Sequence, residues 1–377
     1  MTLTYPPRSI QQWIGFAGTA LLLFMLTTAA HAQLGQSSAL FLRIEPDSRG
    51  AGMGNTGVAL ADNANAMFWN PAGLGFQESS QVGITHANWL PEFDAGLFYE
   101  YLVGTYHLDG VGTFGGNIIF LNLGELEVID GDGNRVRFDN TFEMATGLSY
   151  GRRLSETFSI GGGTRFVYSK LSEGDGDSNS GTATTATFDL SALYRSRPFN
   201  LFGVPTTFSG GANLANMGTY IRYAEEKQAV PTNLRFGYAF TFDFDEYNSL
   251  TVTNDFNKEL VSVDSTGANP DPFYQSVFSA WESRPGELRP GNEDPAELSV
   301  INQFTVGSGL EYWYADLFAL RTGYFYEHPD NGNRQFLTFG AGLRWNIVGI
   351  DFSYLYTLEE DNPLSDTLRF SLLLSFQ

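Results

Sequence analysis

Positions 62 to 76 of the chain read Asp62-Asn63-Ala64-Asn65-Ala66-Met67-Phe68-Trp69-Asn70-Pro71-Ala72-Gly73-Leu74-Gly75-Phe76. The stretch separates a short glycine-rich N-terminal segment from about three hundred residues with a strand-like pattern. Pro71 biases Asn70 toward an extended or turn conformation, and Gly73 and Gly75 permit backbone angles that other residues avoid. Turn chemistry alone fits an ordinary loop before the first strand equally well. A short, partly apolar element of this kind would also suit a plug inside a barrel, so the strands decide between the two.

Beyond this stretch, apolar residues alternate with small or polar ones at a period of two. In residues 234–244, one face carries six large apolar side chains and the other face carries arginine, glycine, alanine, threonine and aspartate. Residues 334–346, 347–358 and 366–377 alternate in the same way. A soluble sandwich would also alternate, but its strands usually have about five or six residues, whereas membrane strands need roughly 9–11. Length and regularity favour a membrane barrel.

The connections between these strands alternate in length. Short turns alternate with mostly longer polar loops, of which 256–300 is the longest. This alternation is typical of outer-membrane barrels, where short turns are periplasmic and long loops external. An even strand number also places both ends of the chain on the periplasmic side. We predict about fourteen strands: 80–87, 94–107, 111–122, 142–151, 157–171, 182–197, 204–216, 233–244, 246–255, 301–314, 316–327, 333–346, 347–358 and 366–377.

The N-terminus is typical of an exported precursor. Fourteen residues from Trp13 to Leu26 form an apolar run, and Ala30-His31-Ala32 fits a signal-peptidase site before Gln33. No later stretch reaches roughly 18 uninterrupted apolar residues, so a membrane protein made from this chain must be a barrel. We therefore predict a signal peptide over 1–32, cleaved between Ala32 and Gln33, a hatch segment over 33–79 and a barrel over 80–377.

Charge and cysteine content exclude several kinds of partner and site. The formal net charge is −21, and it becomes −22 after cleavage because Arg8, the only charge in the signal peptide, is removed. So acidic a protein is not expected to bind nucleic acid. The chain has no cysteine, which excludes disulfides, thiolate nucleophiles and thiolate metal ligands. The predicted fold is all-β: a transmembrane antiparallel barrel of about fourteen strands with the hatch inside.

Two external loops are unusually apolar for solvated segments. The first contains Asn88-Trp89-Leu90-Pro91, and the 256–300 loop combines prolines and acidic residues with aromatic ones. Both are candidate binding surfaces, although packing over the barrel mouth explains the aromatics of the longer loop equally well. The residues predicted to contact a partner are Trp89, Leu90, Pro91, Phe273, Tyr274, Phe278 and Trp281.

Few residue patterns in the sequence are typical of catalysis. The mature histidines, His86, His107 and His328, are scattered, and no His-x-x-x-His sequence occurs. Gly147-Leu148-Ser149-Tyr150-Gly151 matches Gly-x-Ser-x-Gly, but it falls inside the predicted strand 142–151 and is not followed by a helix. We expect no catalytic residues, no metal and no cofactor. A lipid hydrolase assembled from residues on different strands is the enzymatic alternative that sequence order leaves open.

Two acidic runs imitate part of a calcium-binding loop. Asp130-Gly131-Asp132-Gly133-Asn134 starts like one, but Arg135 stands where glycine is required and Thr141 replaces the bidentate glutamate. A second external loop repeats the spacing with Asp175, Asp177 and Asn179. Turn-forming clusters of glycine and aspartate explain both runs, and weak calcium binding is the alternative.

Two levels of family resemblance follow. The segment from Asn55 to Gly75, ending in the hatch motif Asn70-Pro71-Ala72-Gly73, resembles the N-terminal hatch of FadL-type fatty-acid transporters, which are fourteen-stranded barrels. The runs 39–54, 57–59, 63–72, 89–91, 121–126 and 130–134 resemble the PorV family, FadL-like barrels of the type IX secretion system. The resemblance covers the mature N-terminal third in detail.

The PorV resemblance implies a non-enzymatic role in protein export. Such proteins escort cargo with a conserved C-terminal domain from the outer-membrane translocon barrel to the surface attachment complex that holds the sortase. The implied partners are therefore that barrel, the cargo domains, the attachment complex and outer-membrane lipid. The alternatives are a FadL-type transporter of hydrophobic small molecules and, with no supporting residues here, a lipopolysaccharide deacylase.

Overall fold

The computed structural model describes residues 37–93, 95–129, 135–172, 181–224, 226–262, 270–286, 295–359 and 362–376. The predicted signal peptide and its cleavage site, Ala32 and Gln33, lie outside the described residues. The same holds for the calcium-like run 130–134 and for Asp175, Asp177 and Asn179.

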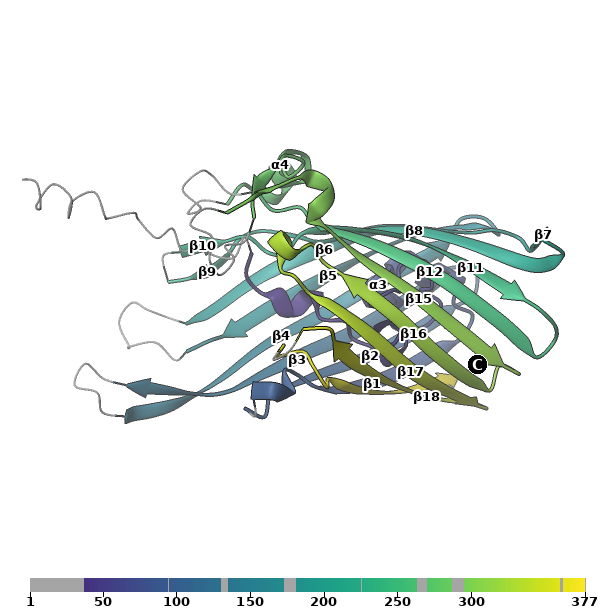
Figure 1. Cartoon of the computed structure of the whole chain (residues 1–377), viewed down its shortest axis with the longest axis horizontal. Coiled ribbons are helices and arrows are strands. Elements are labelled where there is room, and N and C mark those ends of the chain that lie inside the picture. The colour runs from purple at the N-terminus through teal and green to yellow at the C-terminus, as the bar shows by residue number, and fades with distance from the viewer. Residues whose placement is uncertain are drawn as a thin grey trace, which may run out of the picture. The chain divides into compact units, whose positions relative to one another are not determined.

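Fourteen antiparallel strands close into a barrel around the N-terminal segment (Figure 1). The last strand pairs with the first and β11 pairs with β8, so the sheet has no free edge. A further short strand, β7 (Phe199–Leu201), pairs only with the start of β8. The fourteen are β1 (Ser80–Asn88), β2 (Phe98–Leu108), β3 (Gly112–Ile129), β4 (Arg135–Arg153), β5 (Phe158–Lys170), β6 (Thr182–Arg195), β8 (Val204–Gly218), β11 (Asn233–Asp243), β12 (Asn248–Glu259), β15 (Phe304–Tyr314), β16 (Phe318–Tyr326), β17 (Gln335–Trp345), β18 (Val348–Thr357) and β19 (Leu368–Phe376).

Burial alternates along each strand as the sequence pattern predicts. In β1, Gln81 and Thr85 are buried, whereas Val82 and Ile84 are about half exposed. The small and polar residues thus face the lumen, and the apolar residues face outward. This is the reverse of a soluble barrel and is the arrangement that a lipid environment requires.

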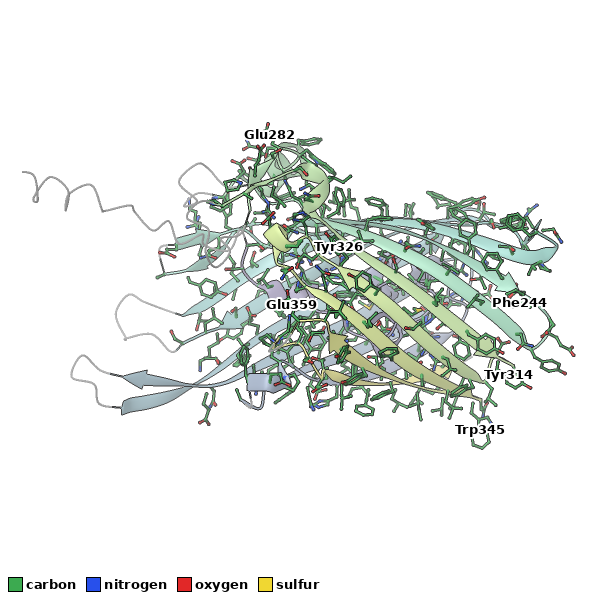
Figure 2. The ribbon with its side chains drawn as sticks, viewed as in Figure 1. Phe244, Glu282, Tyr314, Tyr326, Trp345 and Glu359 are labelled. Carbon is green, nitrogen blue, oxygen red and sulfur yellow. The ribbon has the colours of Figure 1, made fainter. Side chains whose placement is uncertain are left out.

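Aromatic side chains gather on the outer face near both ends of the barrel. Phe98, Phe120, Phe142 and Tyr168 form a row across β2–β5 at the end with the long loops, with ring centroids 5.6 to 6.1 Å apart. Figure 2 places Phe244, Tyr314 and Trp345 together at the opposite end, where the turns are short. Two such girdles mark the two membrane interfaces of an outer-membrane barrel.

Some connections contain more regular structure than expected. The predicted loop 123–141 is largely strand, because β3 continues to Ile129 and β4 begins at Arg135, beyond the ends of their neighbours. The predicted loop 256–300 contains α4 (Phe273–Ser279), β13 (Arg284–Pro285) and β14 (Glu297–Leu298). The remaining elements in the connections are η3 (Pro91–Phe93), β9 (Ile221–Tyr223), β10 (Glu226–Gln228), η4 (Val300–Gln303) and η5 (Pro329–Asn331).

The N-terminal segment, residues 37–79, contains four short helical elements: η1 (Leu40–Arg43), α2 (Ser48–Ala51), α3 (Ala66–Trp69) and η2 (Pro71–Phe76). It begins at the long-loop end, where Ser37 bridges to Ala229, and ends at the start of β1 at the short-turn end. The strand array therefore starts and ends on the periplasmic side, whereas Ser37 lies at the external end. The prediction that both ends of the chain are periplasmic thus fits the last strand but not the start of the described N-terminal segment. Among the described residues, no helix has the length and apolar character needed to cross a bilayer.

Candidate functional site

The N-terminal segment meets one side of the barrel wall backbone to backbone. The inward glycines of β15 and β16 leave a groove into which residues 53–56 fit. A Cβ at Gly309 would lie 2.5 Å from the Met53 carbonyl oxygen, and one at Gly323 would collide with the backbone of Gly54. Gly54 itself has a φ of 69° and touches the Ser308 and Tyr324 backbones. Glycine is needed on both sides because any side chain would separate the two surfaces.

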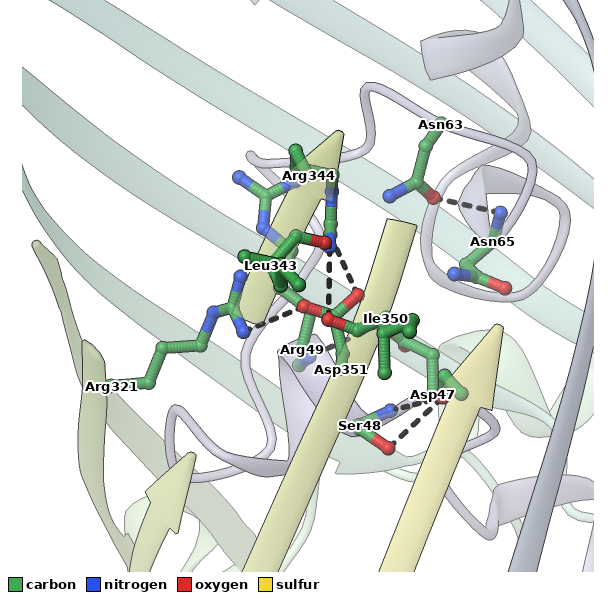
Figure 3. A network of polar contacts seen from close by, with 12 residues as sticks. Asp47, Ser48, Arg49, Asn63, Asn65, Arg321, Leu343, Arg344, Ile350 and Asp351 are labelled. Atoms are coloured by element: carbon green, nitrogen blue, oxygen red, sulfur yellow. Dashed lines mark hydrogen bonds and ion pairs between the residues drawn. The ribbon is translucent and has the colours of Figure 1, made fainter. Parts of the chain in front are cut away.

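Beside this groove, a network of alternating charges joins the segment to the wall (Figure 3). Arg49 donates two hydrogen bonds to Glu311 (2.8 and 2.9 Å) and one to Asp62 (2.6 Å). Glu311 also accepts one from Arg321 (2.6 Å), which donates a second to Asp351 (2.8 Å). The Glu311 and Arg321 side chains are essentially unexposed. Buried charges of this kind must all be paired, so the segment and the wall depend on each other.

Farther along the chain, the predicted hatch motif contacts the opposite part of the wall. Asn70 is fully buried and donates to the carbonyls of Val58 (3.0 Å) and Ala192 (3.1 Å). The Ala72 amide donates to Ser191 Oγ (2.8 Å). Pro71 and Ala72 lie against further inward-facing glycines, Gly151 and Gly161. Asn70, Pro71 and Ala72 of the motif are therefore contact residues between the segment and β4–β6, whereas Gly73 lies against Ala61 of the segment itself.

Trp69 connects the two halves of the segment. Its indole Nε1 donates to Asp47 Oδ1 (2.7 Å), and its ring covers Gly50 and Gly57, where a Cβ would overlap the ring. Burial raises the pKa of Asp47, and the hydrogen bonds from Trp69 and Gly50 oppose that rise. The segment is thus folded onto itself as well as onto the wall.

On the side of β1–β5 the inner wall carries an apolar cluster. Its large members are inward residues of β2 and β3, including Tyr99, Tyr101 and Ile119, which are unexposed and pack with the segment's Phe41 and Met67. The predicted small and polar lumen is therefore correct for β11 and β17–β19 but not for β2 and β3. The segment occupies the space beside the apolar surface.

A polar cavity of about 310 Å³ lies at the short-turn end. Asp62 and Asn63 of the segment line one side of it, and the β15–β16 and β17–β18 turns line the other. Its charged residues are Arg49, Asp62, Asp316 and Arg344, two of each sign. The cavity carries no net charge, and its remaining lining includes the apolar side chains of Trp313, Ile347, Val348 and Leu373.

The predicted contact residues of the first external loop are only partly exposed. Trp89 packs against the apolar cluster, and its amide donates to the Leu97 carbonyl (3.0 Å). Leu90 has a φ of 49°, and Pro91 begins η3. Phe93, which was not predicted as a contact residue, is 57% exposed.

The other predicted contact residues lie on and just after α4, which rests against the outer face of β6 and β8. Phe273 contacts the ring of Phe188 in an edge arrangement with centroids 5.4 Å apart. Tyr274, Phe278 and Trp281, spaced four and three residues apart, are 59%, 82% and 41% exposed. The helix therefore buries one apolar edge and presents an aromatic one.

The described histidines do not come together. His86 contacts Glu100 on the outer face, His107 contacts Thr113, and His328 contacts the Asp330 amide in an external connection. Within the described part of the chain, no group of three or more His, Cys, Asp or Glu side chains is placed to hold a metal ion.

Comparison with known proteins identifies the family. Residues 28–266, more than half of the chain, match the family described as type IX secretion system protein PorV. The chain belongs to the PorV family. This PorV-family chain is therefore an outer-membrane component of the type IX secretion system. A search of curated proteins finds no match.

Solved structures similar to this PorV-family chain are FadL-like barrels. The deltaS2S3 mutant of the monoaromatic hydrocarbon channel TodX, known from Pseudomonas putida, is 11% identical with a TM-score of 0.52, over 87% of this chain and 97% of its own. The Ralstonia pickettii toluene transporter TbuX is 12% identical with a TM-score of 0.48, over 89% and 100%. A Pseudomonas aeruginosa FadL homologue is 14% identical with a TM-score of 0.43, over 88% and 98%. The first likeness shows the fold alone.

Sequence reasoning missed the charged network. Arg49, Glu311 and Arg321 are separated by up to 272 positions, so no spacing rule connects them. The sequence nevertheless carried a signal for the network, because each of its strand members is a charged residue at an inward position of a membrane strand.

Proposed function

We propose that this PorV-family barrel escorts exported cargo, bearing a common C-terminal domain, from the translocon barrel to the surface attachment complex, and that it catalyses no reaction. The observation that carries the proposal is the close docking of the N-terminal segment within the barrel. Hydrogen bonds join this segment to β1, β5, β6, β8, β12, β15, β17 and β19.

A lumen occupied in this way supports a role at the outer surface. Asp255 of β12 accepts hydrogen bonds from the amides of Gly57 (2.7 Å) and Val58 (2.8 Å), and Arg165 of β5 donates to the Met67 carbonyl (3.0 Å). Passage of a solute past residues 37–79 would require many buried contacts to break together. A plug that stays in place is what a surface escort needs, since the barrel must not leak.

The external surfaces supply the binding residues of the proposal. Phe278 and Tyr274 expose more than half of their side-chain area, and Trp281 exposes 41%. Aromatic residues supply a large share of interface energy and are the residues expected to meet β-rich cargo or a partner loop. Trp89, Leu90, Pro91 and Phe273 complete the proposed contact surface.

Co-purification of partners tests this proposal. A tagged copy is purified from its native outer membrane after cross-linking, and the recovered proteins are identified by mass spectrometry. We expect a very large translocon barrel, a sortase-like protein and exported proteins that share a C-terminal domain. The Trp89→Ala/Trp281→Ala variant should recover less of them, since each substitution removes about 1 kcal/mol or more of binding energy.

Trp345→Ala is the matched control, because Trp345 is 77% exposed but lies at the short-turn end. Since Trp89 packs on the apolar cluster, heat-modifiable gel mobility checks that each barrel is folded. Unchanged recovery by the folded double variant would remove these residues from the proposal. Isolation of the wild-type chain alone, with lipid in the barrel, would favour transport.

One observation favours transport of hydrophobic small molecules as a second candidate. The apolar cluster on the inner wall of β1–β5 would suit such a ligand if the N-terminal segment withdrew. The two candidates therefore differ in whether this segment must move. Lipopolysaccharide deacylation finds no comparable support, because none of the described histidine rings is hydrogen-bonded to a serine hydroxyl.

A further inference from the structure

One arginine faces outward at the periplasmic end of the barrel wall. In β4, the even-numbered residues from Phe142 to Tyr150 face outward and the odd-numbered ones are buried, and Arg152 continues the outward series. In the periplasmic halves of the fourteen described strands, no other charged residue occupies an outward position. Within the described part of the chain, the Arg152 guanidinium has no hydrogen-bond or ion-pair partner. Its counter-charge must therefore come from outside these residues.

Arg152 stands where the apolar band of the wall ends. The outward residue before it in β4 is Tyr150, and the one before that is Leu148, which is 68% exposed. The Tyr150 ring lies against Phe114 of β3, with centroids 4.7 Å apart, and its hydroxyl donates to the Val111 carbonyl (2.6 Å). Aromatic rings with a polar end are typical of the headgroup level of a membrane. The Arg152 guanidinium, one outward position farther along the wall, therefore lies at the depth of the lipid phosphates.

Positive charge gathers on this side of the periplasmic end. The ends of β4 and β6 and the residues just after them carry four arginines: Arg152, Arg153, Arg195 and Arg197. Arg153 pairs with Glu78 at 3.5 Å, and Arg197 pairs with Glu156. Arg195 lies over the ring of Phe76, 4.9 Å from its centroid. The two carboxylates balance only half of the four cations, so this side stays positive on a chain whose net charge is −21 and attracts anions.

Beside Arg152, the backbone of the wall lies bare. Gly162 of β5 is an outward position without a side chain, and it pairs with Tyr150 of β4 and Leu190 of β6. Arg152 pairs with Ile160, the next outward residue of β5 toward the periplasm. Glycine in the middle of a strand usually marks a close approach of another group. On the lipid face that group is an acyl chain, which can cross Gly162 while its headgroup stays at Arg152.

We propose that Arg152 binds the phosphate of a phospholipid in the periplasmic leaflet, and that an acyl chain of this lipid lies over Gly162. A guanidinium presents its N–H groups as a planar fork that matches two oxygens of a phosphate. The bond is charge-assisted and forms at the edge of the hydrocarbon, where water competes less than in bulk solution.

The occupant is a lipid because of where the cation stands. A phosphate is present at this depth all around a membrane barrel, and the outward position of Arg152 turns it toward that layer. A carboxylate from another protein would have to be brought there, and the exposed residues beside Arg152, Leu148 and Ile160, are apolar, as acyl chains require. This inference goes beyond the proposed function, since it concerns the periplasmic leaflet and holds whether or not the external surface escorts cargo.

Lipid titration of the purified full-length chain in detergent, read by native mass spectrometry, tests the site. The probe is dioleoylphosphatidylglycerol, and we expect the wild type to bind one molecule more tightly than the following ones. Arg152→Gln should weaken this first binding about fivefold, the effect of one cation near a lipid phosphate. Arg152→Lys should weaken it less, because it keeps the charge but loses the fork. Arg222→Gln on β9 is the matched control, since it removes an exposed arginine at the external end.

The outcomes are distinct from those of the partner experiment, because the purified barrel contains no secretion partner. Equal lipid binding by wild type and Arg152→Gln would overturn the site, whatever proteins the chain recovers from its membrane. Equal weakening by Arg222→Gln would mean that net charge, and not this position, attracts the lipid. Displacement of the lipid by inorganic phosphate at constant ionic strength would show a site for a free anion and overturn the assignment to a phospholipid. Heat-modifiable gel mobility checks that each variant is folded.

Discussion

Glu311 is the residue on which attachment of the N-terminal segment depends most directly. Its carboxylate accepts hydrogen bonds from Arg49 of the segment and Arg321 of the wall, and its side chain is 1% exposed. Trp313 lies beneath two of the network's guanidinium groups, those of Arg321 and Arg344, at 5.5 and 5.4 Å from its centroid. One carboxylate therefore holds two buried cations from different parts of the chain.

We predict that Glu311→Gln lowers the free energy of unfolding by roughly 3 kcal/mol, because it leaves buried cations uncompensated. Denaturant titration of the protein in lipid vesicles measures this change. Glu156→Gln, which removes one charge from an exposed ion pair with Arg197, should change the unfolding free energy by less than about 1 kcal/mol. Equal effects of the two variants would mean that the buried network contributes no more than a surface pair.

At the residue scale, the sequence pattern predicts which residues face the lumen better than it predicts which residues they contact. Alternation correctly assigns Asp351 and Arg344 to the lumen face of their strands. It does not predict that Arg321 bonds to Asp351, or that Arg49 reaches Glu311, because partner choice depends on how the barrel closes and where the segment enters. The predicted contact residues Trp89 and Phe273 pack partly against the barrel, a burial that their loop sequences do not encode.

At the scale of elements, the glycines of the inner wall explain how a helical segment fits inside a sheet. Residues 53–56 pack against Gly307, Gly309 and Gly323. Pro71 and Ala72 pack against Gly151 and Gly161. Two glycine surfaces on different parts of the wall thus hold the two halves of the segment. Glycine in the middle of a strand is otherwise unfavourable, so close approach of another backbone justifies it.

We predict that Gly323→Ala displaces the turn at residues 52–54, because the added Cβ would occupy the position of the Gly54 backbone. Overpacking of this kind costs about 1–3 kcal/mol. Hydrogen exchange of residues 48–58 should become faster, as mass spectrometry of the intact barrel can measure. Gly116→Ala is the control, since its nearest neighbours on the outer face lie 3.9 Å away. Equal protection in both variants would contradict close docking.

Strand positions could be predicted from the sequence, because only an extended strand brings every second residue to the same face over about ten residues. The ends of the strands were harder to predict. Residues 123–141 contain the turn-forming Gly124, whose φ is 78°, and this disguised the continuation of β3 and β4. The two strands of such a hairpin pair with each other and need no further neighbouring strand. The short helix α4 was also missed, because seven residues carry too little helical periodicity.

At the scale of the whole molecule, escort and transport differ in whether residues 37–79 stay in place. Fourteen strands, two aromatic girdles and an occupied lumen are common to both functions. The close docking that supports escort is a property of the resting structure. A test must therefore lock residues 37–79 in place and ask whether the protein still functions. An engineered disulfide can lock the segment without competing thiols, because the chain contains no native cysteine.

Ser48 of the segment and Ser371 of β19 provide that position, with their Oγ atoms 3.0 Å apart. We predict that the variant Ser48→Cys/Ser371→Cys forms a disulfide and still exports cargo at the wild-type rate under oxidising conditions, since an escort needs no movement of the plug. Surface display of a cargo protein measures this, before and after reduction. The single variant Ser48→Cys controls for the oxidant. If export stops when the disulfide closes and resumes on reduction, the segment must move during the cycle. If export is untouched while uptake of a hydrophobic probe becomes redox-dependent, the barrel also transports, and the apolar inner wall of β1–β5 is its path.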